Sequence, residues 1–109
     1  MCYNRNILNS MELIFENQAY DRLEVDVNYT HGLPVDIVGL YRGRLQLLRA
    51  ARDEHDLAAM RCLAFRALQS RSRQQHSICL NNRYCLIVEL HKRPGEAVLE
   101  IVEVRIDDT

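Results

Sequence analysis

The stretch HSICLNNRYCLIVELHKRPGEAVLEIVEVRI, residues 76–106, decides the fold of this 109-residue chain. It holds three runs rich in β-branched residues, separated by an Asn-Asn pair and by the sequence Arg-Pro-Gly-Glu. Such runs, bounded by turn residues, are typical of β-strands joined in hairpins. We therefore predict strands at 76–80, 83–92 and 97–106.

The residues before this stretch have a helical period instead. We predict a short strand at 11–15, a short helix from Asn17 to Val27, and a helix of about 17 residues that follows Pro34 and ends near Arg52. Asp53 is placed to cap one further helical turn. Residues 65–68 could add a short strand. The chain is thus expected to be α+β, with two N-terminal helices packed on a curled antiparallel sheet of about four strands.

The apolar faces of these elements predict the core. The long helix carries an apolar stripe at i, i+3 and i+4 spacing, made of Ile37, Leu40, Tyr41, Leu45, Leu47, Leu48 and Ala51. The central strand has one markedly apolar face, made of Tyr84, Leu86, Val88 and Leu90. We expect the long helix to pack on that face of the sheet.

A two-residue turn at Asn81 and Asn82 would fix the register of the first hairpin. It would place Cys85 across from Ile78, so that Cys79 and Cys85 point to opposite faces and cannot bridge. The four cysteines also lack the C-x-x-C and Cys/His spacings of zinc sites. We expect thiols in a reducing compartment, without a metal or another cofactor.

Length and composition indicate one domain at residues 11–109, preceded by a disordered arm at residues 1–10. An apolar fraction of 48% and a charged fraction of 27% are typical of a folded soluble domain. No apolar run approaches the roughly 20 residues of a membrane helix, so the cytoplasm is the expected compartment. The net charge of -1 conceals a basic block, because residues 61–93 carry six Arg and one Lys against Glu89 alone, a net +6. Such a block favours a polyanionic partner.

The order of these segments, with RLQLLRAARDEHDL at 44–57, HSICLNN at 76–82 and EIVEV at 100–104, resembles the HigB-type toxins of the RelE/ParE superfamily. The resemblance covers roughly residues 11–106. It implies a RelE/ParE-like fold and a small cytoplasmic, metal-independent endoribonuclease that cuts messenger RNA on the ribosome. It also implies a partner, an antitoxin protein of the helix-turn-helix type. In such a cut the ribose 2′-OH attacks the neighbouring phosphate, which requires proton transfer and stabilisation of the phosphate charge.

The resemblance also assigns positions. Glu103, Val104 and Arg105 stand where the family commonly has an acid, an aromatic residue and a histidine. Cys79 and Cys85 occupy two arginine places. The lysine place holds Gln69, while the family pattern is kept at His76, Ser77, Ile78 and Asn81.

The candidate catalytic residues are therefore Glu103 as a base, Arg105 and Arg73 for phosphate charge, and His76 for proton transfer, with His91 as a further histidine. Candidate RNA-binding residues are the arginines of the basic block, Arg66, Arg71, Arg73 and Arg83. Each candidate also has a structural interpretation: His76 could hydrogen-bond the backbone, His91 could be a solvated hairpin-end residue, and Glu103 could merely pair with Arg105 on one strand face. Which sheet face those two share depends on a bulge that the sequence does not fix.

The departures from the family pattern leave a second hypothesis open. A catalytically impaired or inactive relative would bind an antitoxin-like partner or RNA without cleaving it. A gyrase-inhibiting toxin of the ParE branch is a third hypothesis, which the hairpin's similarity to the HigB branch disfavours. A DNA-binding regulator is disfavoured because no helix-turn-helix pattern is present and the basic residues fall mostly on strands and loops.

Overall fold

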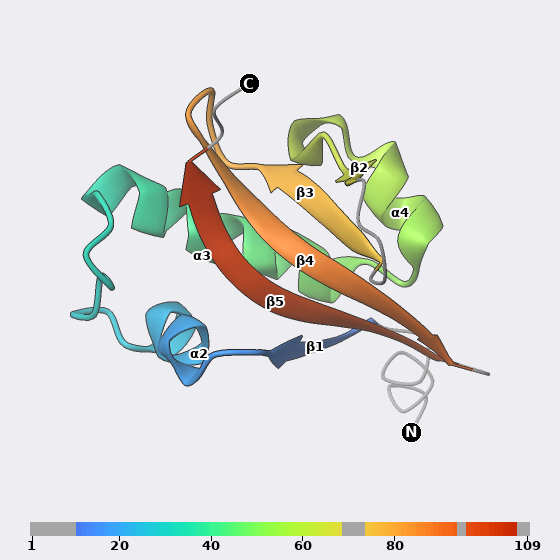
Figure 1. The fold of residues 1–109 in the computed structure, drawn as a ribbon, viewed down its shortest axis with the longest axis horizontal. Coiled ribbons are helices and arrows are strands. Elements are labelled where there is room, and N and C mark those ends of the chain that lie inside the picture. Colours follow the sequence, from blue (N-terminus) through green and yellow to red (C-terminus); the bar gives the residue numbers. More distant parts are fainter. Residues whose placement is uncertain (1–10, 69–73, 94–95, 107–109) are drawn as a thin grey trace.

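A computed structural model of the chain describes residues 11–68, 74–93 and 96–106. These residues form five strands and three α-helices, with one short 3-10 turn (Figure 1). In chain order the elements are β1 (Glu12–Phe15), α2 (Gln18–Val25), α3 (Val35–Ala50), α4 (Glu54–Ala59), η1 (Arg61–Leu63), β2 (Arg66–Ala67), β3 (Gln75–Cys79), β4 (Tyr84–Arg93) and β5 (Glu96–Ile106). The arm expected at residues 1–10 lies outside the described residues.

The strands form one mixed sheet in the order β1-β5-β4-β3-β2. β1 runs parallel to β5, with Glu12 opposite Val98, and the other pairs are antiparallel. The structure is α+β, but the predicted arrangement of two N-terminal helices on an antiparallel sheet of about four strands is wrong. The described residues contain three helices and five strands, and the strand predicted at 11–15, which precedes the helices as β1, joins the sheet parallel to β5, so the sheet is not purely antiparallel. Local periodicity identifies short strands but cannot show which distant strand a four-residue segment pairs with.

The helices begin and end where local chemistry favours it. The Asn17 side chain caps α2 by accepting from the Ala19 amide at 2.8 Å. Asp53 caps α4 as predicted, because its carboxylate accepts from the Asp56 amide at 3.1 Å. Pro34 is the N-cap residue of α3. Its missing N–H costs nothing there, because an N–H at the start of a helix has no partner within the helix. The long helix ends at Ala50, two residues before the expected end.

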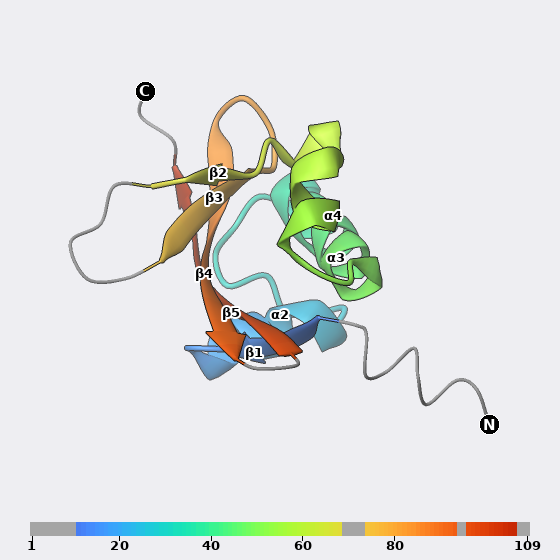
Figure 2. The same cartoon turned by 90° about the vertical axis from the view of Figure 1, so that its right-hand side faces the viewer.

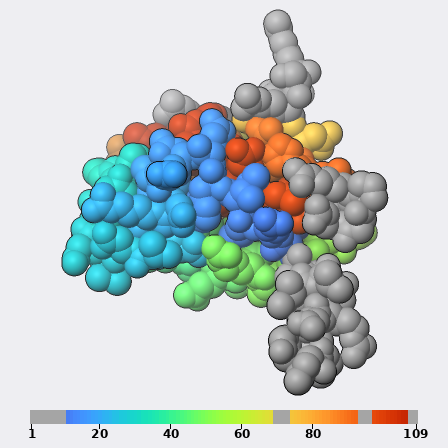
Figure 3. Space-filling model, turned by 90° about the horizontal axis from the view of Figure 1, so that it is seen from below, coloured from blue at the N-terminus to red at the C-terminus, as the bar shows by residue number. Residues whose placement is uncertain are grey.

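The core lies between the sheet and the helices, and α3 and α4 stand on one side of the sheet (Figure 2). The predicted helical stripe is confirmed: its members are all buried or partly buried in the core. The predicted apolar face of β4 also packs there, with Leu86, Val88 and Leu90 buried and Tyr84 partly buried. We call the opposite face of the sheet the distal face. Seen from below, β4 and β5 (orange and red) reach the molecular surface beside β1 and α2 (blue) (Figure 3).

The register of the hairpin between β3 and β4 differs from the prediction. Cys79, not Ile78, is the partner of Cys85. The turn is longer than two residues because the Asn81 side chain accepts from the amides of Arg83 and Tyr84, both at 2.8 Å. The amides of Leu80 and Asn81 both donate to the Tyr84 carbonyl. This one-residue change places Cys79 and Cys85 on the same face, so the expectation that they point to opposite faces is wrong.

Candidate functional site

A β-bulge in β5 brings two candidate site residues to the distal face. Ile101 is opposite Val88 while Glu103 is opposite Ile87, so Val102 is an extra residue in the ladder. Without that extra residue, the alternation of a strand would turn Glu103 toward the helices together with Ile101. After the bulge Val104 packs against the core, and Glu103 and Arg105 lie on the distal face.

Two rows of cross-strand partners cross this face. The first row runs from Arg66 on β2 through Ser77 and Ile87 to Glu103 on β5. The second row, nearer the hairpin turn, is Cys79, Cys85 and Arg105. Ser77 and Ile87 are buried, whereas Arg66 and Arg105 are exposed. Four strands therefore contribute to one patch, which is buried at its centre and exposed at Arg66 and Arg105, and which we call the row site.

A pocket of about 230 Å³ lies at the β2 and β3 side of the row site. Arg66 is on its rim, and the Arg66 Nε donates to the Ser77 hydroxyl at 3.3 Å. Its lining residues are Ala64, Arg66, Ser77, Cys79, Asn81, Asn82, Tyr84 and Cys85. The pocket is thus a small depression whose lining includes hydroxyl, thiol, amide and guanidinium groups.

Glu103 and Arg105 form an ion pair on the distal face. Arg105 Nη2 is 2.6 Å and Arg105 Nε is 3.1 Å from Glu103 Oε2. The two side chains are 42% and 50% exposed, so solvent screens the pair and its net contribution is about 0–1 kcal/mol. A phosphate group could therefore take over the guanidinium at little cost and leave the carboxylate available to accept a proton.

β5 is anchored beneath this ion pair. The Val104 amide donates to the Tyr20 hydroxyl at 3.1 Å, and the Tyr41 hydroxyl donates to the Tyr20 carbonyl at 2.7 Å. Burial raises the pKa of the Tyr20 phenol, and the Glu103 carboxylate adds to the increase, although the Val104 amide opposes it. Burial likewise raises the pKa of the Tyr41 phenol. Both phenols therefore stay neutral and serve as hydrogen-bonding supports for the strand that carries Glu103 and Arg105.

His76 does not join Glu103 and Arg105. It alternates with Ser77 along β3 and shares the helix side of the sheet with Ile78. It is 6% exposed, and its ring stacks on Phe65 with centroids 4.4 Å apart and planes 3° apart. Among the described residues its Nδ1 has no hydrogen-bond partner. The placement therefore separates this proton-transfer candidate from the row site by the thickness of the sheet.

The other predicted residues fall in three places. Arg66 belongs to the row site. Arg83 lies exposed in the turn between β3 and β4. Arg71, Arg73 and the residue at the family's lysine place, Gln69, lie outside the described residues. Of the candidate set, the structure therefore brings Arg66, Glu103 and Arg105 onto one face.

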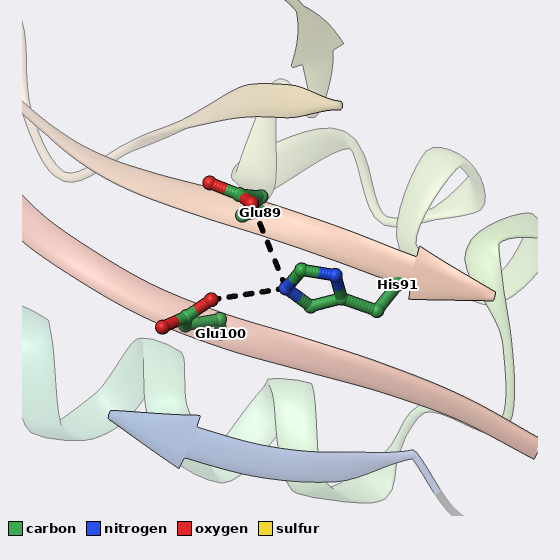
Figure 4. A group of neighbouring side chains, drawn as sticks. All are labelled: Glu89, His91 and Glu100. Carbon is green, nitrogen blue, oxygen red and sulfur yellow. Dashed lines mark hydrogen bonds and ion pairs between the residues drawn. The ribbon is translucent and has the colours of Figure 1, made fainter. Parts of the chain in front are cut away.

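A second polar group lies on the distal face, further along β4. Glu89 and Glu100 are direct cross-strand partners, and His91 is two residues from Glu89. Figure 4 shows the imidazole of His91 between the two carboxylates. The His91 Nε2 is 2.9 Å from Glu100 Oε1 and 3.7 Å from Glu89 Oε1. Like charges directly opposite on neighbouring strands repel, and an imidazole N–H between them offsets part of that repulsion.

These three side chains are also the metal-ligand candidates among the described residues. Their donor atoms lie within 4.8 Å of one another, and imidazole with carboxylate is a donor set that divalent transition metals accept. The hydrogen bond between His91 and Glu100 accounts for the shorter contact without an ion. We therefore treat the group as a hydrogen-bonded cluster that neighbours the row site.

Sequence reasoning missed three features of this face. Glu89 and Glu100 were not singled out, although Glu89 and His91 at i and i+2 of a predicted strand had to share a face. The pairing of Cys79 with Cys85 was missed because it depends on the side-chain capping of the turn. The position of Ser77 beside Arg66 could not be predicted without knowing that β2 pairs with β3.

No protein-family model matches the chain, and no curated protein matches it significantly. None of the helices in the described ranges combines the length and the apolarity that a membrane span requires.

Proposed function

We propose that this chain is the toxin of a toxin-antitoxin pair, an endoribonuclease that cuts messenger RNA on the ribosome. One observation carries the proposal. The positions to which the resemblance assigns catalytic groups, Cys79, Cys85, Glu103 and Arg105, come from three different strands, yet they are neighbours on one sheet face. A shared face is what a site that combines these positions requires.

The row site supplies a base and charge-stabilising groups for a metal-independent cut. The ribose 2′-oxygen forms a new bond to phosphorus, and Glu103 accepts the proton of the 2′-OH. Arg105 stabilises the extra negative charge on the phosphate oxygens, while Arg66, three strands away on β2, contacts a neighbouring part of the RNA backbone. The bond from phosphorus to the 5′-oxygen then breaks, and solvent supplies the proton of the leaving oxygen. Arginine keeps its proton near neutral pH, so Arg105 stabilises charge and does not act as the acid.

The proposal extends to the surroundings of the protein. The toxin acts in the cytoplasm, where messenger RNA and ribosomes are found. The basic block at residues 61–93 provides the charge that attracts an RNA backbone. The partner that neutralises the toxin is an antitoxin protein of the helix-turn-helix type, by the same resemblance.

A specific observation favours a second candidate function. His76 is buried on the opposite side of the sheet, and the family's histidine place holds Arg105. The row site as described therefore pairs one base with charge-stabilising groups but has no histidine acid among them. A relative that binds RNA or an antitoxin-like partner without cleaving would keep the face and lose the proton transfer.

Inducible expression in a bacterial host separates the two functions. Growth is followed and messenger-RNA ends are mapped for the native chain, for Glu103→Gln, and for Arg66→Ala with Arg105→Ala. Arg52→Ala is the matched control, because it removes one exposed arginine that pairs with Asp56 on the helix side. Loss of one proton-accepting group or of one transition-state contact typically lowers the rate by about 10²-fold or more.

The proposed toxin predicts growth arrest and new transcript ends at translated codons for the native chain and for the control. It also predicts that the new ends are missing from a transcript whose start codon has been removed. Growth arrest with intact transcripts would support the non-cleaving relative. Normal growth and intact transcripts, from a folded native chain, would contradict the toxin proposal.

A further inference from the structure

Cys79 and Cys85 face each other on the distal face. They are Cα partners on neighbouring antiparallel strands, and both line the pocket of the row site. Both are thiols in the structure. The proposed ribonuclease chemistry uses neither of them, so the pair calls for its own explanation.

The hydrogen bonding on either side defines the type of this cross-strand pair. The Leu80 amide donates to the Tyr84 carbonyl, one residue beyond the cysteines, and the Leu90 amide donates to the Gln74 carbonyl at the other end of the ladder. Hydrogen-bonded pairs alternate with non-hydrogen-bonded pairs in an antiparallel ladder. Counting from either end makes Cys79 and Cys85 a non-hydrogen-bonded pair.

That type of pair meets the distance requirement of a disulfide. Cα atoms in non-hydrogen-bonded pairs are about 4.5 Å apart, and their side chains are the closer of the two kinds. Disulfides span Cα separations of about 4.4 to 6.8 Å, so a bridge needs only small backbone adjustment. In the reduced structure the Cys79 thiol contacts the Asn81 carbonyl at 3.4 Å. Formation of the bridge removes the thiol proton that makes this contact.

The two thiols differ in accessibility. Cys79 is half-buried at the pocket, whereas Cys85 is 8% exposed between its neighbours. An oxidant that enters the pocket therefore meets Cys79 first. Cys85 lies where a second thiol has to lie in order to attack an oxidised Cys79 sulfur.

We propose that Cys79 and Cys85 are a site of reversible oxidative modification that closes into an intramolecular disulfide. With a peroxide, the Cys79 thiolate attacks one peroxide oxygen and breaks the O–O bond, which gives a sulfenic acid and, from hydrogen peroxide, water. The Cys85 thiolate then attacks the Cys79 sulfur and forms the S–S bond, and the sulfenic oxygen leaves as a second water. Two thiols lose two electrons and two protons, and the peroxide is reduced to two waters. A dithiol reductant reverses the change by thiol-disulfide exchange.

The bridge would alter the row site directly. Arg105 is the cross-strand partner of Cys85, and Arg66 shares the pocket with both cysteines. The disulfide would remove the thiol hydrogen bond from Cys79 to the Asn81 carbonyl and hold β3 and β4 together at the base of the turn. The inference does not require the proposed ribonuclease function, because thiol chemistry reports on it without RNA.

The test uses the full chain with Cys2→Ser and Cys62→Ser, so that the pair supplies the only thiols. The protein is treated with a small excess of hydrogen peroxide, thiols are counted, and intact mass and linked peptides are measured. We expect the thiol count to fall from two to zero, the chain to lose two hydrogen atoms in mass, and a peptide containing Cys79 to be linked to one containing Cys85. Dithiothreitol should restore both thiols, and no disulfide should form between chains.

Two controls keep the proposal open to refutation. In the same background Cys79→Ser should leave the Cys85 thiol unreacted, whereas Cys85→Ser should trap Cys79 as a sulfenic acid that a dimedone probe labels. The native chain, mapped by linked peptides, gives the answer without any substitution. Oxidation of Cys79 to sulfinic acid while Cys85 remains a thiol would overturn the proposal, and so would disulfides that form only between chains.

Discussion

Removal of the Tyr20 hydroxyl should destabilise the fold through a single lost hydrogen bond. The Tyr20→Phe variant keeps the ring, which is 7% exposed, and leaves the Val104 amide without its acceptor. An unsatisfied backbone donor in such a partly buried place costs about 1–3 kcal/mol. In a domain of this size each kcal/mol lowers the melting temperature by about 4–8 °C.

Tyr29→Phe is the matched control. The Tyr29 hydroxyl bonds the exposed His31 ring at 2.8 Å, where water replaces a lost partner, so we expect a change within about 0.5 kcal/mol. Urea unfolding of both variants against the native chain gives the two free energies of unfolding. Equal stability of Tyr20→Phe and Tyr29→Phe would refute the claim that Tyr20 anchors β5 beneath Glu103.

Three further perturbations test the fold. Asn81→Ala removes the acceptor of two backbone amides in the hairpin turn. In urea unfolding it should lower the free energy of unfolding by about 1–2 kcal/mol. An unchanged unfolding midpoint would mean that the turn does not depend on that side chain. Arg42→Met should lower the free energy of unfolding by about 1–3 kcal/mol, because the guanidinium donates to the carbonyls of Leu23 and Asp26 at 2.9 and 2.8 Å. A variant as stable as the native chain would show that these bonds are dispensable. The Asn28 amide and Arg22 hold the pKa of Asp26 below its ordinary value of 3.8, so its charged form stabilises the fold above that value and this contribution is lost as pH falls through the lowered pKa. Asp26→Asn should therefore flatten the fall of melting temperature as the pH drops below the ordinary value of 3.8, and identical pH profiles would contradict the assignment.

Local chemistry made much of the fold predictable. The Asp53 cap, the apolar stripe of α3 and the buried face of β4 all depend on neighbours within a few residues, and the sequence shows those neighbours directly. The parallel pairing of β1 with β5 was not predictable, because it joins residues 12–15 to residues 98–101 across most of the chain. Periodicity contains no information about such a partner.

The candidate site was predictable in its residues but not in its geometry. Glu103 and Arg105 had to share a face, yet only the bulge at Val102 decides which face that is. The capping of the turn by Asn81 likewise decides that Cys79 meets Cys85. The bulge and the capped turn each shift the alternation of side chains between the two sheet faces by one residue. Such a shift changes neither the composition nor the hydrophobic period of the sequence.

The most direct test of the central claim is a nuclear magnetic resonance titration of the isotopically labelled chain with a short 2′-O-methyl RNA, which cannot be cut. If the row site binds RNA, the backbone amide shifts should change most at Ser77, Cys85 and Arg105, and the changes should weaken steeply with added salt. The amides of α3 and α4, on the other side of the sheet, should hardly move. Shift changes concentrated on those helices, or none at any RNA concentration, would contradict the assignment of the distal face as the RNA-contacting surface.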